Sequence, residues 1–223
     1  HKFSNINISS IYIRYYDCFI YTKSNKMKIL NLYCGIGGNR KLWGNLDITA
    51  IEIESKIADK YKKLYPNDKV IVADAHEYLL DHYKEFDFIW SSPPCPTHSR
   101  TNYFTQHIRK RPVYPDMKLY QEIIFLDKFF KGKYCVENVI SYYNPLIKPQ
   151  KIGRHYFWTN FNINNIPQPK NDIGSMEPKY GNVACKKSIE ERNAVNSELG
   201  LHILNCAKNI YKENNNKQIG LFK

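Results

Sequence analysis

Apolar residues occur in short runs and at helical spacings that alternate along the chain from Met27 onward. Runs rich in Ile, Val, Leu and Phe predict buried strands at 28–33, 48–53, 70–72, 88–90 and 134–136. Apolar residues three and four positions apart predict helices through Leu42 and Trp43 and at 55–64, 75–83 and 119–130. Strands that alternate with helices form βαβ units, whose right-handed crossovers limit the topology. The pattern therefore predicts an α/β fold with a doubly wound, mostly parallel sheet.

The regular pattern stops after Val139. Residues 154–161 predict a β-hairpin arm, residues 162–187 contain several Pro and Asn and predict a loop, and residues 194–211 carry one apolar stripe typical of a helix. We therefore divide the chain into one domain (27–161 and 192–212), a small irregular appendage (162–191), an N-terminal extension (1–26) and a tail (213–223).

Composition and charge narrow the class of protein. No apolar run approaches the roughly 20 residues of a membrane-spanning helix, and the six cysteines form no C-x-x-C pair and no spacing with His suited to zinc. We therefore expect reduced thiols in an intracellular protein, with no metal and no membrane segment. The 33 Lys and Arg against 21 Asp and Glu give a net charge of +12, which favours a polyanionic partner.

One cysteine occupies a position suited to chemistry. The predicted strand at 88–90 ends before Pro93 and Pro94, which cannot continue a sheet ladder, and Cys95 follows directly. Ligands of open α/β sheets bind at the carboxyl ends of the strands. A space-filling cysteine needs no mount stiffened by Pro93, Pro94 and Pro96, so we interpret Cys95 as a nucleophile.

Three successive strand ends outline a nucleoside pocket. Gly35, Gly37 and Gly38 follow the first strand, where missing side chains let a ligand approach the backbone. Glu52 ends the second strand, in a place to accept hydrogen bonds from ribose hydroxyls, and Asp74 ends the third, within reach of an adenine edge. A tight turn, a solvated Glu and a helix-capping Asp explain each of them separately, but not the series.

The glycine pattern departs from that of a dinucleotide site. Arg40 occupies the place of the third glycine of G-x-G-x-x-G. This departure favours a cofactor that has a nucleoside and no phosphate, such as S-adenosylmethionine.

Five segments occur in the order, and at about the intervals, of motifs in the cytosine-5 DNA methyltransferase family. They are Leu32-Tyr33-Cys34-Gly35-Ile36-Gly37-Gly38, Pro93-Pro94-Cys95, Glu137-Asn138-Val139, Gln150 with Arg154, and Asn193-Ala194-Val195. From Met27 to about Cys206 the chain therefore resembles this family. The resemblance implies the Rossmann-like fold of S-adenosylmethionine-dependent methyltransferases, that cofactor, double-stranded DNA as the partner, and methylation of C5 of cytosine.

The resemblance also implies the catalytic roles. Cys95 would add as a thiolate to C6 of a cytosine flipped out of the duplex, Glu137 would protonate N3, and Arg154 would hold the O2 side. Chemistry agrees with this assignment, because thiolate addition puts negative charge on the ring, which needs an acid and a donor nearby. Because the strands that carry Cys95 and Glu137 are expected to be neighbours, we predict that the two side chains meet.

Further residues are implied by position in the family motifs. Besides the three glycines, Glu52 and Asp74, the residues implied to line the cofactor pocket are Tyr33, Ile53, Ala75, Pro94, Leu119, Asn193 and Ala194. Residues 100–115 match the mobile loop that closes over the flipped base. The residues implied to contact nucleic acid are Ser99, Arg100, Arg109, Lys110 and Arg111.

The chain departs from the family at several points. Pro96 stands where Gln is usual, Ile152 replaces an Arg, and Arg192 replaces a Gly. Residues 162–191 are all that lies in the place of a separate target-recognition domain. We therefore expect short, loose sequence choice, or a partner protein that supplies specificity.

Three other interpretations remain. An amino-group methyltransferase has a motif like Ser92-Pro93-Pro94, but an aromatic residue follows it instead of Cys95, and Glu137 would have no role. The tRNA-methylating branch of the family typically has a Cys-Phe-Thr tripeptide, which this chain lacks. A binding remnant without turnover is expected to have lost its nucleophile or acid, and both are present.

Overall fold

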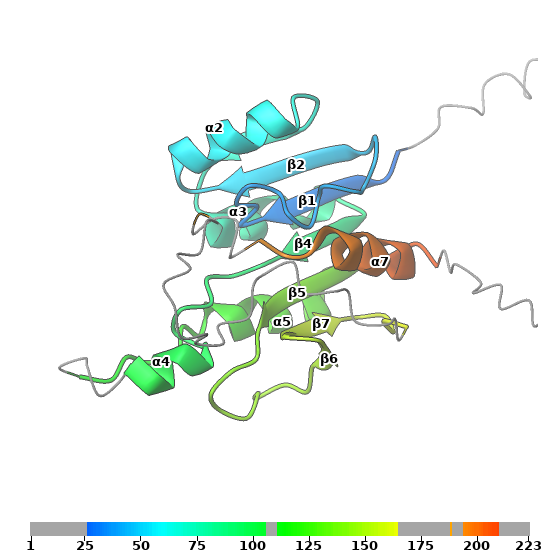
Figure 1. The fold of residues 1–223 in the computed structure, drawn as a ribbon. Helices are drawn as coiled ribbons and strands as arrows, with labels where there is room; N and C mark the ends of the chain where they lie inside the picture. Colours follow the sequence, from blue (N-terminus) through cyan, green and yellow to red (C-terminus); the bar gives the residue numbers. More distant parts are fainter. Residues whose placement is uncertain (1–25, 106–110, 165–187, 189–193, 210–223) are drawn as a thin grey trace, which may run out of the picture.

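The computed structural model of the chain describes residues 26–105, 111–164, 188 and 194–209. The predictions made for residues 1–25, for most of the 162–191 appendage and for the tail lie outside these residues. The described part contains a single seven-stranded sheet with helices on both faces (Figure 1).

The strand order confirms the predicted doubly wound α/β sheet. The order is β3-β2-β1-β4-β5-β7-β6, with β1 to β5 parallel and β7 antiparallel to both β5 and β6. The chain winds outward from β1 to β3 and then returns to place β4 on the other side of β1, which makes the β1/β4 boundary the switch point where such sheets bind ligands. The strands are β1 (Lys28–Leu32), β2 (Asp47–Glu52), β3 (Lys69–Val72), β4 (Phe88–Ser91), β5 (Lys133–Val139), β6 (Gln150–Ile152) and β7 (His155–Thr159).

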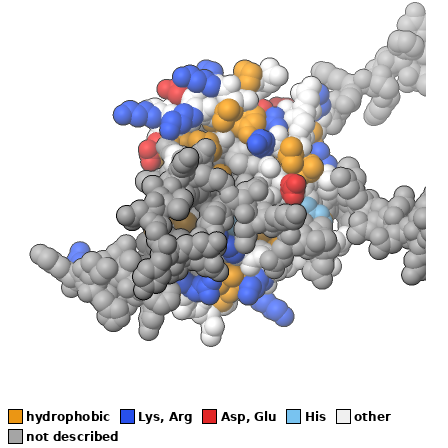
Figure 2. Space-filling view, viewed as in Figure 1, with side chains coloured by type: hydrophobic (Ala, Val, Ile, Leu, Met, Phe, Trp, Pro, Cys, Tyr) orange, Lys and Arg blue, Asp and Glu red, His pale blue; other side chains and the backbone are white. Residues whose placement is uncertain are grey.

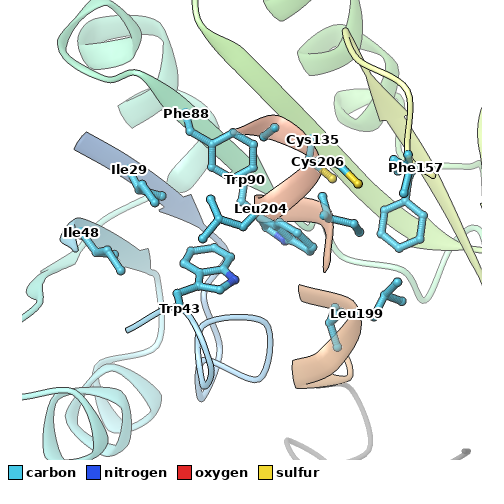
Figure 3. Packing of buried hydrophobic residues seen from close by; sticks show 14 residues of the cluster. Ile29, Trp43, Ile48, Phe88, Trp90, Cys135, Phe157, Leu199, Leu204 and Cys206 are labelled. Atoms are coloured by element: carbon cyan, nitrogen blue, oxygen red, sulfur yellow. The ribbon is translucent and has the colours of Figure 1, made fainter. Parts of the chain in front are cut away.

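Helices cover the two faces of the sheet in separate layers. Alternate strand residues pack into different clusters: Leu30 and Ile89 join the helices α3 and α5, while Ile29 and Trp90 join α7. Figure 3 shows Trp43, Trp90, Leu204 and Phe157 in the second of these clusters. The helices are α2 (Ser55–Leu64), α3 (Ala75–His82), α4 (Arg100–Thr105), α5 (Lys118–Phe129) and α7 (Ser197–Ala207), with a short 3-10 helix η1 (Tyr83–Glu85).

The helix predicted through Leu42 and Trp43 is wrong. Successive turns occupy this segment instead, closed by Gly37 N–H to the Cys34 carbonyl at 2.8 Å and by Trp43 N–H to the Arg40 carbonyl at 3.0 Å. Two buried side chains hold these turns in place. Trp43 packs into the α7 cluster, and Arg40 makes a bidentate contact with Asp68. Tertiary anchoring thus overrides the local helical spacing.

The hairpin arm begins earlier than the sequence indicated. Gln150–Ile152 forms its first strand and His155–Thr159 its second, with Gly153 in the left-handed region at φ +57° in the turn. Its second strand lies within the predicted arm, but Arg154 falls in the turn between the two strands. The sequence-based boundary missed a three-residue strand whose side chains are mostly half-buried.

Basic side chains gather on parts of the surface. Figure 2 shows Lys and Arg side chains over α2, where Lys56, Lys60, Lys62 and Lys63 are exposed.

Within the described ranges, no helix is both long enough and apolar enough to span a membrane.

Candidate active site

Cys95 lies just past the end of β4, in a turn that several backbone contacts close. The Cys95 carbonyl accepts hydrogen bonds from the N–H groups of His98 and Ser99, both at 3.0 Å. The Asn138 side chain donates to the Pro93 carbonyl at 2.9 Å, which ties β5 directly to the Pro-Pro-Cys segment. The thiol is therefore carried by a segment fixed on both sides of it.

Two neighbouring segments support the same turn. The Asp116 N–H donates to Thr97 Oγ1 at 3.0 Å, and the Tyr143 hydroxyl lies 2.6 Å from His98 Nδ1. Burial lowers the pKa of His98, so this buried ring stays neutral and its contact with Tyr143 is a hydrogen bond between uncharged groups. Hydrogen bonds as well as prolines therefore restrain the Cys95 segment.

Glu137 lies on β5, the strand next to β4, and is only 5% exposed. Burial and the nearby Glu137 carboxylate both raise the pKa of the Cys95 thiol. The Glu137 carboxylate therefore acts electrostatically on the thiol. In the free protein the thiol is protonated at neutral pH, so nucleophilic attack requires that its proton be removed.

Only one of the three predicted pocket glycines borders open space. Gly35 has φ +53°, and a Cβ placed there would meet no atom within 4 Å. A Cβ at Gly37 would collide with the Tyr65 and Tyr61 rings, and one at Gly38 would lie 2.7 Å from the Ala194 Cβ. Gly35 therefore leaves room for a ligand, while Gly37 and Gly38 permit close packing of the chain on itself.

The predicted acidic residues do lie at successive strand ends beside this opening. Glu52 accepts hydrogen bonds from the N–H groups of Gly35 at 3.0 Å and Glu54 at 3.1 Å. Ile53, directly after it, is 63% exposed and offers an apolar surface. Asp74 caps α3 by accepting from the His76 N–H at 2.8 Å. These contacts orient both carboxylates without using all their acceptor capacity.

The other predicted site residues differ in what they offer. Ala75 and Leu119 belong to the core, at 3% and 2% exposure, and present little surface to a ligand. Tyr33 and Ala194 are half-buried and Pro94 is exposed. Ser99 and Arg100 lie at the start of α4, and Arg100 and Arg111 are exposed. Asn193, Arg109 and Lys110 lie outside the described residues.

Comparison with known protein families decides the class of this site. A family model for C-5 cytosine-specific DNA methylases matches residues 27–141, which include the glycine turn, Cys95 and Glu137. The chain belongs to this family. No curated protein matches the methylase chain.

Several solved structures are similar to this methylase, and the chain covers a different share of each of them. They include a hypothetical protein from Thermus thermophilus (11% identity, TM-score 0.42, 70% of this chain and 87% of that one). A SAM-dependent methyltransferase from Agrobacterium tumefaciens matches at 13% identity and TM-score 0.38, over 60% of this chain and 46% of that one. A DNMT2 mutant from Spodoptera frugiperda matches at 24% identity and TM-score 0.36, over 51% and 35%.

In this methylase the side chain that contacts Glu137 is that of His155, a residue that the sequence analysis did not single out. His155 Nδ1 lies 2.5 Å from Glu137 Oε1, whereas Arg154 is exposed in the β6–β7 turn. Sequence reasoning missed His155 because only the antiparallel register of β5 and β7 reveals which hairpin residue shares a face with Glu137. The only indication in the sequence was that His155 directly follows Arg154, a residue of a family motif.

A second missed residue, Glu122 of α5, joins three parts of the methylase site. Its carboxylate accepts from the Tyr33 hydroxyl and the Ser91 hydroxyl, both at 2.6 Å, and lies 3.0 Å from His76 Nδ1. Tyr33 has φ +54°, a left-handed backbone conformation that is unfavourable for any residue other than glycine. Glu122 thus holds the turn before Gly35, the end of β4 and the first turn of α3 together.

We expect His76 to make the methylase less stable at alkaline pH. Its hydrogen bond to Glu122 raises its pKa above the ordinary histidine value, despite burial. A pKa raised in the folded state contributes stability that is complete below the unfolded pKa and is lost as pH rises through the folded pKa. Urea unfolding between pH 6 and pH 9 measures the free energy of unfolding of the wild type and of His76→Gln at each pH. Equal pH dependence in the two proteins would contradict the expectation.

Proposed function

We propose that this chain is a DNA (cytosine-5-)-methyltransferase that acts on a flipped-out cytosine, with S-adenosylmethionine as the methyl donor. The observation that carries the proposal is the pairing of Cys95 and Glu137. Adjacent strands present the two groups, and the Glu137 carboxylate raises the pKa of the Cys95 thiol. A thiol and a carboxyl group carried at neighbouring strand ends can act on two atoms of one pyrimidine ring.

The two side chains have complementary tasks. The Cys95 thiol gives its proton to the Glu137 carboxylate, the thiolate forms a bond to C6, and the electrons displaced from the ring are stabilised when Glu137 passes that proton to N3. C5 thereby becomes electron-rich enough to accept a methyl group. After transfer, water takes the C5 proton, the C6–S bond breaks to return the thiolate, and the N3 proton returns to Glu137.

The residues at the strand ends fit the cofactor. Gly35 leaves space beside the backbone, Glu52 can accept hydrogen bonds from ribose hydroxyls, and Ile53 offers an apolar surface to a base. Asp74 is placed to accept from an adenine amino group while it caps α3. When bound, S-adenosylmethionine supplies an electrophilic methyl group on a sulfonium. We include Tyr33, Pro94, Ala194 and Asn193 in the same pocket.

The charge of the chain supports a nucleic-acid substrate. The net charge of +12, the exposed Arg100 that follows the Cys95 segment, and the exposed Arg111 suit contacts with phosphates. We assign Arg109 and Lys110 to the same set, and assign double-stranded DNA as the partner because the family is one of DNA methylases. We assign the O2 side of the base to Arg154, which is exposed in the hairpin turn next to His155.

Trapping of the covalent adduct tests the proposal. Duplex DNA that contains 5-fluorocytosine cannot lose a proton at C5, so incubation with S-adenosylmethionine should leave the protein joined to DNA through Cys95, as intact mass and peptide mapping would show. The same assay with single-stranded DNA and tRNA measures the preference for the polymer. An adduct on tRNA alone would contradict the DNA assignment, and the absence of any adduct would contradict the mechanism.

A further inference from the structure

His155 approaches Glu137 from the hairpin and not from the strand that delivers Cys95. Strand β7 is antiparallel to β5, with Phe157 opposite Glu137 and His155 opposite Val139. His155 and Glu137 are therefore diagonal neighbours on one face of the sheet, and Nδ1 lies 2.5 Å from Oε1. This contact occupies one oxygen of the carboxyl group. Among the described residues, Oε2 accepts no hydrogen bond.

The surroundings of the pair allow it to exchange protons. The His155 side chain keeps 22% of its surface exposed, whereas that of Glu137 keeps 7%, so solvent reaches the imidazole more readily than the carboxyl group. Burial alone would lower the pKa of His155, and Arg154 lowers it as well, but Glu137 raises it above the ordinary histidine value. Two thiols interact with Glu137, namely Cys95 and, on the same strand β5, Cys135; Lys151 of β6 is exposed.

We propose that His155 is a positioning residue that holds the Glu137 carboxyl group by Oε1, leaves Oε2 for the base, and balances the charge that Glu137 gains when it gives up its proton. The inference rests on the proposed function, because Glu137 acts there as the acid. The inference gives the hairpin the role of holding Glu137, which His155 performs and Arg154, in the turn, does not.

In the free protein the Glu137 carboxylate pairs with the His155 imidazolium ion, and the Cys95 thiol carries its proton. In each turnover the S–H bond of Cys95 breaks and Glu137 takes that proton at Oε2. When the thiolate bonds to C6, the O–H bond of Glu137 breaks and an N3–H bond forms, which makes Glu137 a carboxylate again beside the imidazolium. When Cys95 leaves, the N3 proton returns through Glu137 to the thiolate. His155 keeps its proton throughout, so its positive charge balances the carboxylate each time Glu137 loses a proton.

An NMR titration of the free protein tests the pair without any turnover. With ring-labelled histidine, the His155 pKa should lie above that of an exposed histidine in the wild type and fall in Glu137→Gln, because the amide cannot carry the negative charge. His82, whose Nδ1 contacts Glu85 Oε1 at 2.7 Å on the surface, supplies the internal reference. A His155 pKa that does not respond to Glu137→Gln would overturn the inference even if the adduct forms.

The pH dependence of adduct formation separates positioning from simple structural support. In His155→Asn the amide nitrogen stands near Nδ1 and can still donate to Oε1, but it cannot take up a proton. We expect the adduct rate on 5-fluorocytosine DNA to fall roughly 10- to 100-fold and its pH profile to lose the inflection due to His155. His82→Asn, which removes a similar pair on the surface, should leave both unchanged.

The outcomes distinguish the two proposals. If the wild type forms no adduct, the proposed function fails, while the titration still shows whether His155 and Glu137 share a proton equilibrium. If the wild type forms the adduct and His155→Asn matches it in rate and pH profile, His155 is only a structural residue and the inference is wrong.

Discussion

Replacing Cys95 by serine should abolish both adduct formation and methyl transfer. A serine hydroxyl is far less acidic than a thiol, and burial beside Glu137, which already raises the Cys95 pKa, would make an alkoxide still scarcer. We expect a loss of roughly 10³-fold or more, equivalent to about 4 kcal/mol of barrier. Initial rates with tritiated S-adenosylmethionine and duplex DNA measure it. Cofactor affinity should stay near that of the wild type, because the substitution removes no contact at Gly35, Glu52 or Asp74.

A matched control makes this experiment specific to the active site. Cys206 lies on α7 in the core and belongs to none of the proposed catalytic or cofactor residues, and Cys206→Ser introduces the same chemical change there. That variant can lose stability because a hydroxyl replaces a buried thiol, but the folded protein should keep its activity. If Cys95→Ser methylates DNA within tenfold of the wild-type rate, Cys95 is not the nucleophile. The pH profile of the wild type should also rise towards alkaline pH, because burial and Glu137 keep the thiol protonated at neutral pH.

The sequence could predict those site residues whose position depends only on where a single strand ends. Cys95, Glu52 and Asp74 each follow a strand that its apolar residues reveal, and parallel strands bring their carboxyl ends to the same edge. The doubly wound, mostly parallel sheet could be predicted because crossovers have one hand. The sequence also predicted that the strand before Cys95 and the strand of Glu137 are neighbours, and β4 and β5 are paired.

The parts that the sequence did not predict depend on contacts between distant segments. His155 reaches Glu137 only through the register of an antiparallel hairpin, and a shift of one residue would have presented Arg154 instead. Arg40, whose presence argued against a dinucleotide site, also has a structural partner in Asp68, 28 positions away. No local spacing reveals a partner of that kind. The sequence predicted a helix around Arg40. The segment forms turns instead, because the contact of Arg40 with Asp68 and the packing of Trp43 determine its conformation.

Replacing Glu122 by glutamine should destabilise the fold strongly. The substitution keeps the shape of the side chain but turns one carboxylate oxygen into an NH2 group, so either the Ser91 hydroxyl, or the Tyr33 hydroxyl together with His76, loses its acceptor. Because the Glu122 side chain is fully buried, the new NH2 group cannot turn to water instead. Breaking a buried charged network by changing one member costs about 3–5 kcal/mol, a large part of the stability of a single domain.

Urea unfolding of Glu122→Gln measures this loss as a lower midpoint with an unchanged slope, which indicates that stability and not the surface exposed on unfolding has changed. Glu85→Gln is the matched control, because Glu85 pairs with His82 on the surface and its loss should cost less than about 1 kcal/mol. A midpoint for Glu122→Gln as close to the wild type as that of the control would show that the network adds little. A large loss would mean that one carboxylate on α5 holds together the turn before Gly35, the end of β4 and the start of α3, which are the elements that carry both the cofactor pocket and the nucleophile.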